Sequence, residues 1–397
     1  MRSFQKSKNN AFFALLSLPS TAMGFALSIQ ISALSWILTT QYGLDIHDVG
    51  LVWAAGPLAG IIGQVLIGVI SDKVWFWNGR RRPFILIGGV LAALMLLALP
   101  NLDVISRSMG VSGILGVAIA VALTLDLAIN VSFNPTRSII ADVTDEGDER
   151  TKGYTWMQSI SGTFGVLAYA VGAVFNNYVL IYAGAVIVLL FSVLPPLLIT
   201  EPRHLEPEGE DMDAARHDAA GKEDSYLNIL LAIRPLWGFL VYDIYAMGRR
   251  MAGVEPANYY AEIACAVVTI ALVAQALAAK DRGESGGLAA FHKVIAAHSF
   301  SWVGIQTTFV FLFAFLQQQM PLVPDLELGR IGSMSFLVLN AVGALLPALV
   351  LMPMAHRIGR IRTHVICLAF MTAGYVGLYW YGESPLRIYA LMAVVGI

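Results

Sequence analysis

Long apolar runs separated by short polar segments dominate the chain. Six runs fill the first half, at about 12–40, 49–71, 84–100, 113–135, 154–175 and 178–199. Three more lie at about 295–320, 333–354 and 363–382, and a last one starts near Leu386 and is still apolar at Ile397. A helix of about 20 apolar residues matches the ~30 Å hydrocarbon core of a bilayer. The pattern predicts an all-α, polytopic membrane protein that is truncated inside its final helix.

The segment between the two groups of runs has a different character. From Glu201 to Asp224 it holds nine Asp or Glu against three Lys or Arg, which is typical of a solvated linker. Two weaker apolar runs follow, at about 227–248 and 258–279, and Asp243 inside the first is costly in lipid. They are either an inserted helix pair, which we favour, or two interfacial segments. The predicted organisation is a six-helix bundle at 1–200, an acidic cytoplasmic linker at 201–225, an inserted pair at 226–290 and an incomplete C-terminal bundle at 291–397.

Composition excludes a soluble enzyme. Hydrophobic residues make up 57% and charged residues 13% of 397, with a mean hydropathy of +0.69, whereas soluble domains have roughly 45–50% and about 25%. The two cysteines, Cys265 and Cys367, both lie in apolar runs and suggest neither a disulfide nor a metal site. We find no phosphate-binding loop, dinucleotide motif or nucleophile elbow. We therefore expect no enzyme activity, no cofactor, no metal and no nucleic-acid partner.

Positive charge gathers in certain loops and predicts the orientation. The basic residues are Arg2, Lys6 and Lys8 before the first run, Lys73 and Arg80–Arg82 after the second, and Arg357, Arg360 and Arg362 after the eighth core run. Loops rich in Lys and Arg stay on the cytoplasmic side. We expect an inner-membrane protein with a cytoplasmic N-terminus. The second and third basic segments either echo each other as parts of an internal repeat, as in transporters with two parallel repeats, or are unrelated loops.

Asp126 is the sharpest candidate for chemistry. It lies in the middle of an apolar run, with no Lys or Arg within ten residues on either side. Intramembrane ionisable residues are functional by default, because a charge is expensive in lipid. Such a carboxyl is suited to taking up and releasing a proton, and we assign proton coupling to Asp126 and Asn130. The alternative is a neutral Asp126 hydrogen-bonded to Asn130, one turn away.

Charged residues near the same helix end suggest a conformational latch. Arg137 lies three turns beyond Asp126, and Asp142 can pair with the basic cluster after the second run. Pro135 is expected to kink or end the helix. The predicted latch residues are Asp72, Lys73, Arg80, Arg81, Arg82, Arg137, Asp142, Arg357 and Arg360.

Uncharged polar and aromatic residues within the runs predict the substrate class. Amides, hydroxyls and rings suit a neutral polyhydroxyl ligand, and an anion would require a buried cation that the N-terminal half does not offer. Each single Ser or Gln is also compatible with helix packing. The candidate substrate-binding residues are Ser28, Gln30, Ser32, Trp36, Gln64, Gln158, His298, Trp302, Gln306 and Asn340.

Two motifs carry a family resemblance. Gly68-x-x-Ser71-Asp72 followed by Gly79-Arg80-Arg81-Arg82-Pro83-Phe84-Ile85 resembles the loop between helices two and three of sucrose–proton symporters of the major facilitator superfamily. The stretch from Asp126 to Asp142 is similar to that family's fourth helix. The resemblance implies twelve helices in two six-helix bundles, with Asp126 as the proton carrier. The chain departs from the family at Gly24-Phe25-Ala26-Leu27-Ser28, where the family usually has Gly-Trp-Ala-Leu-Gln.

The predicted function is proton-coupled symport of a neutral sugar, a disaccharide or another glycoside, by alternating access. A major facilitator antiporter that exports a drug or metabolite is the alternative, and a non-transporting sugar sensor is a third reading. The expected partners are a small-molecule sugar, protons and the lipid bilayer, and the expected state is a monomer.

Overall fold

The computed structural model describes residues 8–60, 70–71, 74–110, 113–202, 233–251, 258–278 and 286–397, together with Gln5 and Val254. Most of the predicted linker and three predicted site residues, Gln64, Asp72 and Lys73, lie outside the described residues. The chain divides into two compact units, one made of Met1–Arg203 and Phe309–Ile397, the other of His204–Thr308. The four-segment organisation predicted from the sequence stays a prediction.

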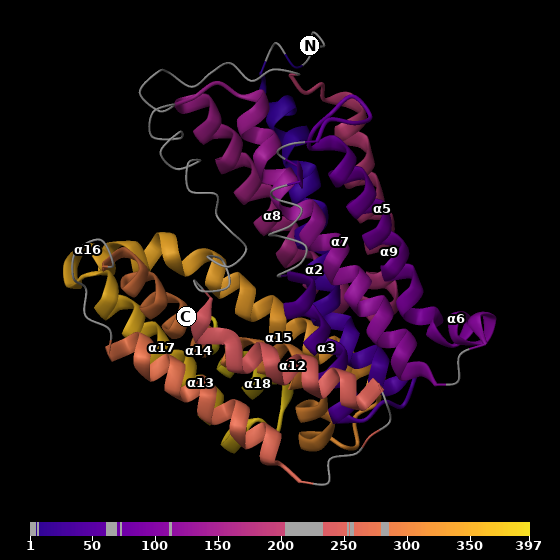
Figure 1. Ribbon diagram of the computed structural model, residues 1–397, viewed down its shortest axis with the longest axis vertical. Coiled ribbons are helices and arrows are strands. Elements are labelled where there is room, and N and C mark those ends of the chain that lie inside the picture. The colour runs from indigo at the N-terminus through magenta and orange to yellow at the C-terminus, as the bar shows by residue number, and fades with distance from the viewer. Residues whose placement is uncertain are drawn as a thin grey trace. The chain divides into compact units, whose positions relative to one another are not determined.

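The first part of the larger unit is a group of long helices that run alongside one another (Figure 1). They are α2 (Asn10–Thr40), α3 (Ile46–Gly60), α5 (Arg82–Ala98), α7 (Ile114–Val143), α8 (Asp148–Val174) and α9 (Asn177–Leu198). Helix α2 packs against α7, α8 and α9 and is buried along most of its length. A cluster around Phe12, Phe13, Ile140 and Met157 forms the core at the start of α2.

Glycines bring α5 close to its neighbours. A methyl group at Gly88 would lie 2.7 Å from the carbonyl oxygen of Ala128 and would clash with Ser132, both on α7. One at Gly89 would clash with Ser192 on α9. Small residues let helix backbones approach closely in membranes, where association depends on van der Waals packing. Helix α5 is therefore wedged between α7 and α9.

Proline does not end the membrane helices. The sequence predicts that Pro135 kinks or ends its helix; α7 runs through Pro135 to Val143, so the second alternative is wrong and the kink stays a prediction. Neighbouring helices and local hydrogen bonds satisfy the backbone groups that proline leaves free, and a transmembrane helix tolerates it for that reason. Pro19 lies inside α2 in the same way.

Beyond α5, the short η2 (Leu99–Asn101) and α6 (Leu102–Met109) continue the chain and end at Gly110, which has a left-handed φ of 65°.

The second part of the larger unit comes from the C-terminal third. It contains the end of α14 (Gly286–Gln319), α15 (Asp325–Leu346), the π-helical η5 (Pro347–Leu351), α16 (Met352–Ile358), α17 (Arg360–Tyr381) and α18 (Pro385–Val395). Helix α15 starts earlier than the apolar run at 333–354. Its first turns contain Asp325, Glu327 and Arg330, so they are not apolar and were not part of that run. It packs against α8, α2 and α9.

The smaller unit contains a helical hairpin. The short η3 (Arg234–Leu236) leads into α12 (Trp237–Met251), which packs against α13 (Tyr260–Ala278). Gly238 lies against the Cys265 carbonyl and Thr269, and the Arg249 guanidinium is 3.3 Å from the Glu262 carboxylate. Helix α13 is long and apolar enough to cross a membrane and largely exposed.

Within the described residues the secondary structure is helical, and nine helices are long and apolar enough to span a bilayer. The prediction of an all-α, polytopic membrane protein is confirmed.

Candidate functional site

The Asp126 carboxyl lies inside the helix group, where only 9% of the residue is exposed. Its partner is Gln30 of α2, whose Nε2 donates to both carboxyl oxygens at 3.1 Å. Gln30 is itself only 1% exposed, and its Oε1 has no hydrogen-bond partner among the described residues. The carboxyl therefore meets one neutral amide across the α2–α7 interface.

Two further residues shape the surroundings of this carboxyl. A methyl group at Gly56 of α3 would lie 3.2 Å from Asp126 Oδ2, so the missing side chain lets the α3 backbone approach the acid. The Asn130 amide donates to the backbone oxygen of Asp126 at 2.8 Å. The sequence suggested Asn130 as the alternative partner of the carboxyl. In the structure the carboxyl accepts its hydrogen bonds from Gln30, which was predicted as a substrate ligand.

Asp126 forms no ion pair with any described residue. The next charged residue along α7 is Arg137, 11 positions on, which corresponds to about 16 Å along a helix. The Arg137 guanidinium lies over the Phe133 ring at 4.5 Å, on its own helix. Nothing described around the acid thus offers a compensating positive charge.

A second polar cluster joins the two parts of the larger unit. The hydroxyls of Ser32 on α2 and Ser333 on α15 are 2.6 Å apart, and Ser333 also donates to Asn177 Oδ1 on α9 at 3.0 Å. Trp36 Nε1 donates to the Asp325 backbone oxygen at 2.8 Å. Ser32, Trp36, Asn177 and Ser333 are buried, so their contacts replace hydrogen bonds to water, whereas Asp325 is exposed.

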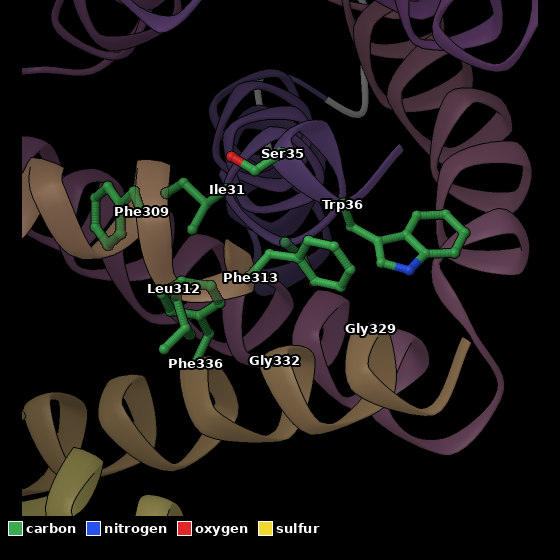
Figure 2. Close-up of a pocket in the computed structure, with 10 residues that line it drawn as sticks. Ile31, Ser35, Trp36, Phe309, Leu312, Phe313, Gly329, Gly332 and Phe336 are labelled. Carbon is green, nitrogen blue, oxygen red and sulfur yellow. The ribbon is translucent and has the colours of Figure 1, made fainter. Parts of the chain in front are cut away.

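A small pocket adjoins this cluster. Figure 2 shows it between α2, α14 and α15, with the rings of Phe309, Phe313 and Phe336 beside Ile31 and Trp36. Its volume of about 10 Å³ has room for about one water molecule. Sugar-sized ligands need several hundred cubic ångströms.

Arg330 closes the same end of the helices. Its guanidinium donates to the carbonyl oxygens of Ala173 and Val174, at 3.1 and 3.0 Å, where α8 ends. These last carbonyls have no partner within the helix, and a cation there also opposes the negative end of the helix dipole. A methyl group at Gly329 would come within 2.8 Å of Trp36 Nε1. We call this region, defined by Ser32, Trp36 and Arg330, the Trp36 end.

The opposite end carries the basic loop, and we call it the basic end. Arg80 and Arg81 both lie 3.3 Å from Asp142 at the end of α7, so the expected pairing is present. Glu201, just after α9, accepts hydrogen bonds from the backbone N–H groups of Arg80, Arg81 and Arg82 at 2.7, 2.9 and 2.6 Å. These contacts join elements of residues 1–202 to one another. The role of a latch between two bundles stays a prediction.

Lys8, two residues before α2, forms ion pairs at the basic end as well. Lys8 Nζ is 2.7 Å from Glu149 and 2.9 Å from Asp145. Its hydrogen bond and charge hold the pKa of the Asp145 carboxyl below the ordinary range.

The remaining predicted ligands are spread over both units. Ser28 and Asn340 donate within their own helices, to Gly24 and Phe336. Gln158 is exposed on α8, and Arg357 and Arg360 are exposed around the start of α17. Three candidates belong to the smaller unit or its part of α14, namely His298, Trp302 and Gln306. Of these predicted ligands, Gln30 contacts Asp126, and Ser32 lies at the Trp36 end. Their roles as substrate ligands stay predictions.

Sequence reasoning missed Glu201, Asn177 and Ser333. Glu201 looked like the first residue of an acidic linker, and its position directly after an apolar run was the only available signal. Asn177 and Ser333 are common packing residues in membrane helices, and their pairing depends on contacts across 156 positions of sequence.

Comparisons with known proteins agree with this architecture. The family model described as Major Facilitator Superfamily matches residues 16–397. Sucrose transport protein SUC4 of Arabidopsis thaliana is 26% identical over 293 residues, which cover 61% of this chain and 56% of that protein. The general alpha-glucoside permease of Schizosaccharomyces pombe is 30% identical over 174 residues, covering 39% of this chain and 31% of that protein. The matched regions span about half of these relatives' length or less.

Solved structures show the same fold. The nucleoside transporter NupG has a TM-score of 0.57 at 13% identity, covering 98% of this chain and 79% of that chain. The peptide transporter POT in complex with sulfate has a TM-score of 0.58 at 17% identity, covering 97% and 79%. These are transporters and not enzymes. The family match across nearly the whole chain, together with the shared fold and the membrane-length helices, establishes that the chain belongs to the Major Facilitator Superfamily.

Proposed function

We propose that this protein carries a neutral sugar, a disaccharide or another glycoside, across the cytoplasmic membrane together with protons, by alternating access. The observation that carries the proposal is the buried Asp126 carboxyl, which has an amide partner and no cation among the described residues. A carboxyl paired with a neutral amide can exist with or without its proton, whereas one paired with a guanidinium is held ionised.

The polar groups near the Trp36 end and the relatives support the proposed substrate class. Ser32, Ser35 and Trp36 lie beside three phenylalanines, and the pocket lining contains no charged residue. Aromatic faces and hydroxyls suit a ring that carries hydroxyl groups, while an anion would need a desolvated cation. Relatives named as a sucrose transport protein and an alpha-glucoside permease support the same choice.

The size of the pocket and the contacts around it support alternating access. A cavity of about 10 Å³ cannot hold a sugar, so loading requires α2 and α15 to separate. The contacts that would have to open are those of Ser32 with Ser333, of Trp36 with Asp325 and of Arg330 with the end of α8. Because basic loops stay inside, we assign the basic end to the cytoplasm and the closed Trp36 end to the outer face.

The test is uptake of radiolabelled glycosides into proteoliposomes that contain the purified protein, with and without an inward proton gradient. We expect accumulation with the gradient only. Asp126→Asn keeps the shape of the side chain but cannot exchange a proton, and it should abolish accumulation while retaining exchange of sugar for sugar. Asp103→Asn, a matched change in the exposed α6, should behave like the wild type.

Each contrary outcome has its own meaning. Full accumulation by Asp126→Asn would refute the proton role. Substrate that leaves the vesicle in exchange for protons entering down the inward gradient would indicate the antiporter. Sugar binding with no flux in any condition would indicate the sensor.

A further inference from the structure

We propose that Gln30 is a positioning residue whose hydrogen bonds change with the protonation state of Asp126. Its amide nitrogen donates to the ionised carboxyl, and its amide oxygen accepts from the protonated carboxyl. The proposal rests on the proposed proton coupling and deepens it. It also assigns Gln30 to the coupling step, although its residue type and position first suggested a sugar ligand.

The observed hydrogen bonds fit the ionised form of Asp126. One amide nitrogen donates to both carboxyl oxygens, at 3.1 Å each, and a donor shared between two oxygens satisfies a delocalised negative charge. The cost of this arrangement falls on the other end of the amide. Gln30 Oε1 is buried and has no partner in the part of the chain that the structure describes, and a buried acceptor without a donor is unfavourable.

Protonation supplies the missing donor. A proton moves from water to one carboxyl oxygen, and the new O–H can donate to Gln30 Oε1. Gln30 Nε2 then donates to the remaining carboxyl oxygen, so the amide and the acid form two parallel hydrogen bonds. This pairing requires the amide to shift relative to the carboxyl, because Nε2 now serves one oxygen in place of two. The partner atoms of Gln30 therefore differ between the two proton states.

Helix α2 carries that shift toward the Trp36 end. Ser32 lies two residues after Gln30 and bonds Ser333 and Asn177, and Trp36 follows one turn later and bonds the Asp325 carbonyl. Tightly packed helices respond as units, with small displacements converted into a choice between two arrangements. The helix that senses the proton thus also holds the contacts that must open for loading.

The titratable groups on the described helices around this site bear on a pH-dependent readout. Helix α8 carries Asp148, Glu149, Arg150 and Lys152 in its first turns and the buried Tyr169 further along. Helix α5 carries Arg82 at its start, and α9 carries Tyr178 and Tyr182 in its first turns. The sequence of α2 contains no charged residue. On α3 the titratable side chains are the exposed His47 and the half-buried Asp48, both in the first turn. On α7 they are Arg137 and Asp142, which lie toward the basic end.

The first test is the pH profile of proton-driven uptake. Gln30→Met keeps the length and bulk of the side chain but can neither donate nor accept as an amide does. The variant leaves the ionised carboxyl without its donor and the protonated carboxyl without its two hydrogen bonds. An unpaired buried charge costs more than an unpaired neutral acid, so the pH of half-maximal uptake should move upward by about one unit, a tenfold change in proton concentration. Ser17→Ala is the control, because Ser17 is equally buried on α2 and donates to its own helix, and its profile should match the wild type.

The second test uses the wild-type protein, so its result does not depend on how Gln30→Met folds. With ¹³C placed in the glutamine side-chain carbonyls, acidification should shift one carbonyl band in the infrared difference spectrum. The shift should vanish in Asp126→Asn.

A Gln30→Met protein with the wild-type pH midpoint, or a labelled wild type without the band shift, would overturn the proposal. Failure of the proposed function is distinguishable from this result, because it would appear as proton-driven accumulation by Asp126→Asn.

Discussion

Removal of the Glu201 carboxylate should open the start of α5. Helix α5 begins at Arg82, and its N-cap residue, Arg81, provides no side-chain cap. Glu201, only 5% exposed, takes over that task from the end of α9 by accepting three consecutive backbone N–H groups. Glu201→Ala leaves these donors without their acceptor and removes an anion from the positive end of the helix dipole.

The magnitude can be bounded from these contacts. Loss of a single N-cap costs about 1 kcal/mol, while a hydrogen bond to a charged group contributes roughly 1.5–3 kcal/mol. The three bonds share one carboxylate, and water can reach the N–H groups once it is gone, so their contributions do not add in full. We expect a local loss of about 2–4 kcal/mol. Each 1.4 kcal/mol corresponds to a factor of ten, so opening becomes about 30- to 700-fold more frequent.

Hydrogen exchange of the backbone amides at residues 80–82 measures this opening directly. The matched control is Glu383→Ala, because Glu383 lies 3.7 Å from Arg387 in an exposed ion pair. Such a pair contributes about 0–1 kcal/mol, and its loss should leave the amides at 80–82 unchanged. Glu201→Gln, which keeps the shape and loses the charge, should fall between the wild type and Glu201→Ala. Exchange less than threefold faster in Glu201→Ala would refute the reasoning.

Two further predictions concern packing and pH. Gly88→Leu should destabilise the fold by about 1–3 kcal/mol through overpacking, because a side chain there meets the α7 backbone, and it should therefore lower the thermal midpoint in detergent. Gly116→Ala should leave the midpoint equal or higher, because nothing lies within 4 Å of that position. The hydrogen bond from Lys8 lowers the pKa of Asp145, so the pair stabilises the fold above the ordinary carboxyl pKa of about 4 and loses that contribution as the pH falls through the lowered value. The thermal midpoints of Lys8→Met and the wild type should therefore differ at pH 7 and converge as the pH falls through the lowered pKa of Asp145, and a difference that persists once this carboxyl is protonated would contradict the assignment.

The sequence by itself determined the class of this protein. Apolar runs of membrane length follow from the requirement that a helix in lipid satisfy its own backbone hydrogen bonds, a local property that needs no knowledge of neighbours. The isolated position of Asp126 was equally visible, since its neighbours along the helix are apolar and uncharged. The basic loop after the second run indicated a partner for Asp142, which the structure shows, whereas the orientation it indicates stays a prediction.

Only the tertiary structure decided which groups meet. Gln30 and Asp126 are 96 positions apart, Arg80 and Glu201 are 121 apart, and Ser32 and Ser333 are 301 apart. A lone Gln, Glu or Ser in a membrane sequence has many possible partners, because helix rotation and depth are set by packing against other helices and leave no mark in the local hydropathy. The local pattern therefore located the acid, whereas helix packing selected the amide that faces it.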